Sequence, residues 1–292
     1  MTKYLHINGE LIEREAAHVS ALDRGFRYGD AVFETLRVYN GQPFRWEKHM
    51  NRLAGSCEAI RLEHNVSPTT LRDYAEETLN ANELQEAYLR IAISRGVQPG
   101  TLTPAPAVSP TIAIQTEPLP RGGVDGTSTW DEPATCIIAE TRRIPSESIP
   151  SQVKSHNYLN GILAAIEARD AGVDEAILLD PDGYLTETPT ANLFGVKGNE
   201  LRTPSTETLP VLPGITREEI ISLATGAECA VVEGEWKPSL LVECDEVFLT
   251  NSTWEIRPVT MIDETEYPVG SVTTELQHSF NKLIESTCYA RP

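Results

Sequence analysis

A lysine near the middle of the chain has the surroundings of a reactive amine. The chain contains six lysines against eighteen arginines, and one of these lysines, Lys154, stands in the run Val153-Lys-Ser-His-Asn-Tyr158. A neutral amine is both a nucleophile and a proton carrier. A solvated lysine near a helix start is the alternative interpretation. The motifs described next favour the reactive amine.

An arginine in the N-terminal part of the chain is a candidate for binding an anion. Arg52 lies in the run His49-Met-Asn-Arg-Leu53, within residues 47–63, whose apolar residues predict an amphipathic helix. A guanidinium fork matches the oxygens of a phosphate, whereas a lysine offers only a point charge. On its own, such an arginine is usually solvated.

A predicted helix start in the C-terminal half offers a second anion site. Pro213-Gly214 precedes a helix predicted over residues 218–225, and Thr216 and Glu219 stand at capping-box spacing. A helix N-terminus presents free backbone N–H groups and the positive end of a dipole. A cap alone would also explain Thr216.

A strand predicted to end at residue 39 can present one row of side chains to a ligand. Side chains two apart share a face of a strand, so Phe33, Thr35 and Arg37 point one way. Val32, Glu34, Leu36 and Val38 then point the other way. Arg37 could equally be a solvent-exposed strand residue that does not contact a ligand.

The order of these stretches resembles that of the fold type IV pyridoxal-phosphate enzymes, the class IV group of branched-chain and D-amino acid aminotransferases and aminodeoxychorismate lyase. The resemblance spans residues 23–259 and rests on the Lys154 run, residues 175–196, the run Leu212-Pro-Gly-Ile-Thr-Arg217 and residues 248–259. It implies a mixed α/β fold with a small α/β domain (1–118), a linker (119–133) and a larger domain with a barrel-like mixed sheet (134–292). The cofactor is expected between the domains, and homodimers with partner loops in the substrate pocket are expected.

The resemblance also implies the cofactor, pyridoxal 5′-phosphate, and the roles of the candidate residues. Lys154 is the catalytic lysine, which forms a Schiff base and carries the proton between the substrate α-carbon and the cofactor. Glu187 is the carboxylate on the pyridine nitrogen. The other implied cofactor residues are Arg52, Tyr158, Asn192, Ile215, Thr216, Ser252 and Thr253. A purely structural role in a turn explains the presence of Asn192 nearly as well. The implied substrate residues are Tyr28, Phe33, Thr35, Arg37, Tyr88, Arg90, Arg95, Thr253 and Trp254.

The sequence favours an aminotransferase that moves an amino group from an amino acid to a 2-oxo acid. Thr35 and the run Thr250-Asn-Ser252 resemble aminodeoxychorismate lyase, which is the alternative, whereas the Lys154 run and Ser252-Thr-Trp-Glu-Ile256 resemble the aminotransferases. Residues 94–101 lack the Arg-x-His carboxylate trap of bacterial D-amino acid aminotransferases, although Arg95 or Arg90 could substitute. A binding protein without turnover is disfavoured because Lys154, Glu187 and Arg52 are all present.

Composition excludes several other classes of function. The 292-residue chain has 43 acidic and 24 basic residues and a net charge of −19, which argues against a nucleic-acid partner. The spread of acidic residues along the whole chain favours adaptation to high salt, with a merely soluble acidic surface as the alternative. Neither a bilayer-spanning apolar run nor a signal peptide is visible, so we expect a cytoplasmic protein.

Other patterns predict the supporting elements. Five cysteines without CxxC spacing and six histidines without a close ligand pair predict reduced thiols and no metal site. Asn8-Gly9 predicts a hairpin over residues 4–12, and a helix is expected over 68–81 with strands over 87–94 and 111–115. The helix expected after Lys154 has an apolar stripe made of Leu159, Ile162, Leu163 and Ile166. Gly122-Gly123-x-x-Gly126 is not followed by a helix pattern, so we do not expect a phosphate loop.

Overall fold

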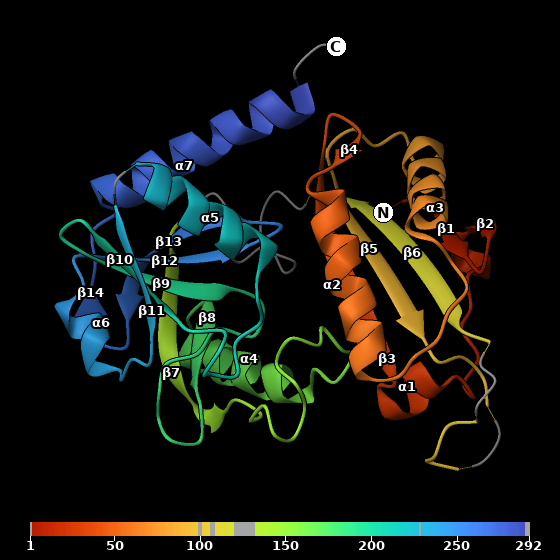
Figure 1. Cartoon of the computed structure of the whole chain (residues 1–292), viewed down its shortest axis with the longest axis horizontal. Coiled ribbons are helices and arrows are strands. Elements are labelled where there is room, and N and C mark those ends of the chain that lie inside the picture. The colour runs from red at the N-terminus through yellow and green to blue at the C-terminus, as the bar shows by residue number, and fades with distance from the viewer. Residues whose placement is uncertain (1, 99–100, 106–108, 120–131, 228, 290–292) are drawn as a thin grey trace. The chain divides into compact units, whose positions relative to one another are not determined.

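A computed structural model describes residues 2–98, 101–105, 109–119, 132–227 and 229–289 of the chain (Figure 1). The chain divides into two compact units. The first comprises Met1–Leu119, Val153–Asn157 and Thr287–Pro292, and the second comprises Pro120–Gln152 and Tyr158–Ser286. The segment that carries Lys154 thus belongs to the first unit, whereas the predicted domain limits placed it in the second domain. Most of the predicted linker, with its Gly122-Gly123-x-x-Gly126 run, lies outside the described residues.

The first unit is a six-stranded antiparallel sheet with two long helices on one face (Figure 1). The strands follow the order β2-β1-β6-β5-β3-β4. Asn8 and Gly9 have φ values of 52° and 94° in the turn between β1 and β2, which confirms the predicted hairpin. The elements are β1 (Tyr4–Ile7), β2 (Glu10–Glu13), a 3-10 turn (Arg14–Ala16), α1 (Arg24–Tyr28), β3 (Ala31–Tyr39), β4 (Gln42–Pro43), α2 (Trp46–Ala59), α3 (Pro68–Ala81), β5 (Ala87–Ser94) and β6 (Thr111–Pro118).

Strand β3 has two different faces, as its alternating side chains predict. Val32, Leu36 and Val38 are fully buried in a core that also contains Met50 and Leu53 of α2. The opposite row, which begins at Phe33, is left for other contacts. A strand that packs on one face and presents the other can hold functional side chains in a fixed register.

Helix α2 ends earlier than predicted. The prediction that the helix extends to residue 63 is wrong, because Arg61 has a left-handed φ of 51°. The N–H of Leu62 donates to the carbonyl of Cys57, and the N–H of Arg61 donates to that of Glu58. These are the two bonds of a Schellman motif, and the buried Leu62 side chain enters the core directly after it.

The second unit is built on a curled, mixed sheet with the strand order β11-β10-β9-β12-β13-β7-β8, and β14 pairs with β13. Strand β7 pairs in parallel with β8 and with β13, and β10 pairs in parallel with β11. Strand β12 pairs antiparallel with β9 on one side and with β13 on the other. The elements are β7 (Ala134–Arg142), α4 (Leu159–Ala171), β8 (Glu175–Leu179), β9 (Asn192–Lys197), β10 (Glu200–Pro204), α5 (Ile215–Gly226), β11 (Ala230–Gly234), α6 (Ser239–Glu243), β12 (Glu246–Asn251), β13 (Glu255–Ile262), β14 (Thr265–Glu266) and α7 (Ser271–Ile284), followed by a π-helical turn (Glu285–Tyr289).

Helix α4 forms where a helix was predicted, but it packs through the opposite face. The predicted apolar stripe is exposed, with exposed fractions of 69% for Leu159, 51% for Ile162, 48% for Leu163 and 37% for Ile166. The buried residues are instead Gly161, Ala164 and Ala168. Small side chains allow α4 to approach β7 and β8 closely, so the larger residues remain on the outer face. None of the helices in the described part of the chain is long and apolar enough to cross a membrane.

Candidate active site

Lys154 lies on an extended segment that pairs with the free edge of β3. The N–H of Phe33 donates to the carbonyl of Lys154 and the N–H of His156 donates to that of Ala31, both at 2.9 Å. Ser155 is the bridge partner of Val32, so Ser155 faces the core while Lys154 and His156 face the other side. The backbone N–H of Lys154 also donates to Ser56 Oγ of α2 at 3.2 Å. The amine of Lys154 lies 4.6 Å from the centre of the Phe33 ring.

Five of the predicted substrate residues share the face of the first sheet on which Lys154 lies. Thr35 is the cross-strand partner of Arg90, and Arg37 is the partner of Tyr88. Antiparallel partners lie on the same face, so these four residues join Phe33 there. The Arg90 guanidinium lies 3.7 Å from the centre of the Phe33 ring. The structure therefore brings an amine, an aromatic ring and a guanidinium together on one surface.

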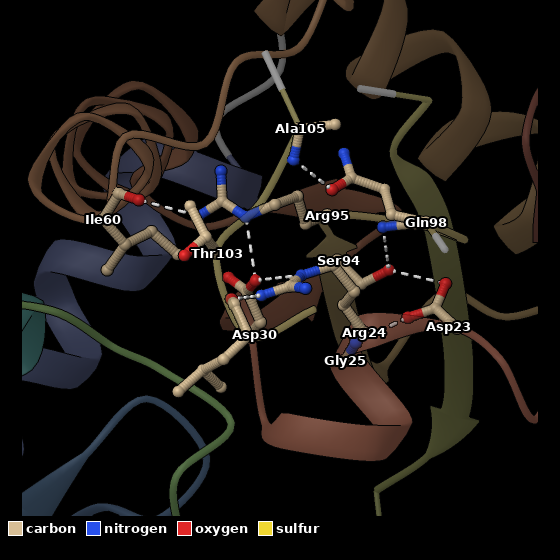
Figure 2. Close-up of polar contacts among 12 residues, drawn as sticks. Asp23, Arg24, Gly25, Asp30, Ile60, Ser94, Arg95, Gln98, Thr103 and Ala105 are labelled. Atoms are coloured by element: carbon tan, nitrogen blue, oxygen red, sulfur yellow. Dashed lines mark hydrogen bonds and ion pairs between the residues drawn. The ribbon is translucent and has the colours of Figure 1, made fainter. Parts of the chain in front are cut away.

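Arg95, another predicted substrate residue, has structural contacts instead. Figure 2 shows its guanidinium beside Asp30, to which Nε donates at 2.8 Å. Its Nη1 and Nη2 donate to the carbonyls of Arg61 and Ile60 after α2, at 2.6 and 2.7 Å. Arg95 is 5% exposed and all three of its nitrogens are engaged, so it is not available as the substrate contact that was predicted.

Tyr28 ends the short helix α1, whose start belongs to the same network as Arg95. Arg24 shares Asp30 with Arg95 and donates to it at 2.8 Å (Figure 2). The guanidinium groups of Arg24 and Arg27 lie 5.0 and 4.9 Å from the Tyr28 ring centre. The half-buried Tyr28 ring is thus held by two cations.

Arg52 of α2 is held by the buried carboxylate of Glu34, on the core side of β3. Arg52 Nε and Nη2 donate to the two oxygens of Glu34 at 2.7 and 2.8 Å, and His49 Nδ1 lies 2.7 Å from Glu34 Oε2. Burial alone would raise the pKa of Glu34, but the charge and hydrogen bonds of Arg52 and the bond to His49 outweigh it and hold the pKa at about 2. Neither Glu34 nor His49 was predicted as a site residue. A charged residue on the otherwise apolar row of β3 is the signal that indicates such a partner.

In the second unit, Glu187 accepts from Arg143, Asn192 and Leu212. Arg143 Nη2 lies 2.7 Å from Oε1, while Asn192 Nδ2 and the backbone N–H of Leu212 donate to Oε2 at 3.0 and 3.1 Å. Charge-assisted and neutral hydrogen bonds from different parts of the unit fix the orientation of this carboxylate. Asn192, one of the residues implied as a cofactor contact, thus braces Glu187. Arg143 was not predicted, because it lies 44 residues from Glu187 and only the fold brings them together.

The start of α5 differs from the prediction. The helix begins at Ile215 with Gly214 as the N-cap, and no side chain caps it, so the predicted capping box at Thr216 is wrong. Thr216 instead lies in the first turn and is 4% exposed. The N–H groups of Ile215 and Thr216 have no intrahelical acceptor, and they form the kind of helix end that binds anions. A side chain at Gly214 does not fit, because its Cβ would lie 2.0 Å from Asn192 Oδ1.

The remaining predicted cofactor residues, and the predicted substrate residue Trp254, lie in two short connections of the second unit. Ser252, Thr253 and Trp254 are half-buried in the turn between β12 and β13, where Asn251 Oδ1 accepts from the N–H groups of Thr253 and Trp254 at 2.9 and 2.7 Å. Tyr158 is the half-buried residue directly before α4. Near the turn, Thr250 pairs with Asn192 in the sheet, and its buried Oγ1 has no hydrogen-bond partner among the described residues.

Comparison with known proteins identifies the family. The family model for amino-transferase class IV matches residues 31–262. The branched-chain-amino-acid aminotransferase of Escherichia coli K12 is 33% identical over 285 residues, which cover 95% of this chain and 91% of that one. A crystal structure of the Escherichia coli enzyme has a TM-score of 0.91 at 32% identity, covering 97% of this chain and 95% of that chain.

Two further relatives bear on the cofactor and on the alternative activity. The T.th. branched-chain amino acid aminotransferase, solved with pyridoxamine 5′-phosphate, has a TM-score of 0.89 at 28% identity, covering 100% of this chain and 96% of that chain. Aminodeoxychorismate lyase of Bacillus subtilis is 30% identical over 298 residues, covering 98% of this chain and 97% of that one. The chain therefore belongs to the class IV aminotransferases, and it is a pyridoxal-phosphate-dependent enzyme with their mixed α/β fold.

Proposed function

We propose that this aminotransferase moves amino groups between branched-chain amino acids and 2-oxo acids. The observation that carries the proposal is the placement of Lys154 on one sheet face with Phe33, Thr35 and Arg90. The amine is beside an apolar ring suited to an aliphatic side chain and near a guanidinium suited to a carboxylate. The similarity to branched-chain aminotransferases over nearly the whole chain supports the same substrate class.

The described residues fit pyridoxal phosphate. The first turn of α5 offers backbone N–H groups and the buried Thr216 hydroxyl to a phosphate. Glu187 offers a carboxylate of fixed orientation to the ring nitrogen of the cofactor, and Asn192 braces this carboxylate. Thr250 pairs with Asn192 in the sheet, and its buried hydroxyl has no hydrogen-bond partner among the described residues. Arg52, oriented by Glu34, presents a guanidinium for the phosphate. We propose Ser252, Thr253 and Tyr158 as further contacts of the cofactor.

Different residues of the chain are proposed to have different roles in the reaction. Bound pyridoxal phosphate supplies an electron sink for the bond that breaks at the substrate α-carbon. Lys154 is proposed to carry the proton away from that carbon as a general base and to return it as a general acid. Phe33 and Tyr88 are proposed to exclude water beside the amine, and Arg37 and Arg90 to bind carboxylate groups. Glu187 is proposed to keep a proton on the ring nitrogen.

We further propose that the enzyme is a homodimer in the cytoplasm of a salt-adapted cell. The exposed apolar stripe of α4 and the exposed Phe26 and Leu102 side chains, which are 77% and 75% exposed, support burial against a second copy. The net charge of −19 supports adaptation to high salt, where ions screen the repulsion between surface carboxylates.

A half-reaction experiment tests the proposed activity. The purified protein, loaded with pyridoxal phosphate in high salt, is followed by its visible spectrum during addition of single L- and D-amino acids. We expect L-leucine, L-isoleucine or L-valine to convert the bound pyridoxal form to the pyridoxamine form, and a 2-oxo acid to reverse the change. Conversion by other amino acids but not by these three would contradict the branched-chain assignment.

Aminodeoxychorismate lyase is the second candidate, and one residue favours it. Thr35 occupies a position where branched-chain aminotransferases usually have glycine, and the Bacillus subtilis lyase is 30% identical to this chain. Pyruvate release from aminodeoxychorismate, together with no conversion by any amino acid, would establish the lyase in place of the aminotransferase.

A further inference from the structure

Helix α2 carries a buried hydroxyl that contacts the segment of the proposed catalytic lysine. The helix buries Met50, Leu53 and Cys57 in the core of the first unit. Ser56 is buried with them and is 2% exposed. A hydroxyl in such a place costs free energy unless it takes part in a hydrogen bond. Its Oγ accepts from the backbone N–H of Lys154 at 3.2 Å, so this buried oxygen has a partner on the lysine itself.

The backbone turns tightly at Lys154. The N–H of Ser155 donates to the carbonyl of Val153 at 3.0 Å, which closes a three-residue turn with Lys154 at its centre. Before the turn, the Val153 side chain is buried in the same core as α2. After it, the carbonyl of Lys154 accepts from the N–H of Phe33 at 2.9 Å. Strand β3 therefore holds Lys154 by its carbonyl, whereas Ser56 of α2 holds it by its amide.

The same helix and strand hold the arginine that is proposed to bind the phosphate. Arg52 and Ser56 are four residues apart, so they lie on successive turns of α2 and face the same side. Arg52 donates to both oxygens of Glu34 on β3, and β3 also pairs with the segment of Lys154. Helix α2 and strand β3 thus form one frame that fixes the backbone of Lys154 relative to Arg52.

We propose that Ser56 is a positioning residue, which holds the amide of Lys154 so that the amine meets the aldehyde carbon of pyridoxal phosphate. This inference rests on the proposed role of Lys154 and adds the residue that places it. The amine nitrogen bonds to that carbon while the aldehyde oxygen leaves as water, and this equilibrium depends on where the amine is held. Pyridoxamine phosphate already carries an amino group on the same carbon and forms no bond to the lysine. Ser56 therefore contributes to the affinity for the first cofactor form and not for the second.

Three substitutions separate positioning from packing. Ser56→Ala removes the acceptor and one heavy atom. Ser56→Cys fills the site but offers only a weak sulfur acceptor. Cys57→Ala is the matched control, because Cys57 is the next residue of α2, is 3% exposed and likewise loses one heavy atom. The dissociation constants of pyridoxal phosphate and pyridoxamine phosphate are measured by fluorescence titration of the cofactor-free full-length proteins.

We expect Ser56→Ala to weaken pyridoxal phosphate about fivefold, a loss typical of one hydrogen bond, and to change pyridoxamine phosphate by no more than about twofold. Ser56→Cys should show the same difference between the two cofactor forms. Cys57→Ala should change neither constant by more than about twofold. Equal weakening of both forms in the two Ser56 variants, or no change in either form, would overturn the proposal.

A double substitution tests whether Ser56 acts through Lys154. Lys154→Ala should weaken pyridoxal phosphate more than Ser56→Ala does, and adding Ser56→Ala to Lys154→Ala should cause no further loss. A further fivefold loss in the double variant would show that Ser56 acts on the cofactor by another route and would contradict the positioning role. Full affinity for pyridoxal phosphate in Lys154→Ala would refute the role of Lys154 itself, whereas full affinity in Ser56→Ala alone would refute only the role of Ser56.

Discussion

At the scale of single residues, the contact between Glu34 and Arg52 shows how a buried charge prepares an anion site. Glu34 is completely buried, yet its carboxylate is ionised because Arg52 and His49 surround it. The guanidinium is therefore fixed in orientation before any phosphate arrives. A preformed donor lowers the entropic cost of binding.

Replacing Glu34 by Gln should destabilise the protein in a pH-dependent way. The folded-state pKa of Glu34 is about 2, against an ordinary value of 4.5, so its ionisation stabilises the folded state above pH 4.5 and this stabilisation is lost as the pH falls towards 2. We expect Glu34→Gln to lower the free energy of unfolding by about 3 kcal/mol at pH 7 and by about half as much near pH 3. Urea denaturation at both pH values measures this, with the exposed Glu58→Gln on α2 as the control. An equal loss at both pH values would contradict the assignment.

At the scale of elements, the start of α5 combines an uncapped helix end with a close packing contact. Gly214→Ala would place a Cβ 2.0 Å from Asn192 Oδ1 and displace the amide that donates to Glu187. We expect about tenfold weaker binding of pyridoxal phosphate, which corresponds to about 1.4 kcal/mol, measured by titration of the cofactor-free protein. Gly226→Ala at the other end of α5 has open space around its Cβ and serves as the matched control. Unchanged affinity in Gly214→Ala would contradict the role of this helix end.

The outer face of α4 supports a prediction about assembly. Ile162→Glu introduces a charge into the exposed apolar stripe, and we expect it to convert the proposed dimer to a monomer in sedimentation experiments, because burying that charge in an interface is costly. Val242→Glu on α6, where Val242 is 70% exposed outside the stripe, is the control and should remain dimeric. A dimeric Ile162→Glu protein would show that the stripe lies outside the interface.

Local patterns predicted some elements correctly and others incorrectly, for identifiable reasons. The alternation of β3 and the Asn8-Gly9 hairpin follow from neighbouring residues and were predicted correctly. The end of α2 and the packed face of α4 depend on which core each helix meets, so helical periodicity alone misassigned them. Arg143 was not assigned a role because its partner, Glu187, is distant in sequence.

At the scale of the whole molecule, the excess of acidic residues predicts a dependence on salt. At 0.1 M salt the screening length is about 10 Å, so many of the surface carboxylates repel one another, whereas at 2 M it falls to roughly 2 Å. With a net charge of −19, we expect the melting temperature to rise by roughly 5–10 °C between 0.1 and 2 M KCl, measured by circular dichroism. A constant or falling melting temperature would contradict salt adaptation.

The most direct test of the account is chemical identification of the lysine that bonds the cofactor. The protein loaded with pyridoxal phosphate is reduced with borohydride, digested, and analysed by peptide mass spectrometry, alongside Lys154→Ala and the control Lys197→Ala. We predict a phosphopyridoxyl group on Lys154 in the unmodified protein and in Lys197→Ala, and neither label nor amino transfer in Lys154→Ala. Labelling of a different lysine, or amino transfer by Lys154→Ala at the unmodified rate, would contradict the central claim.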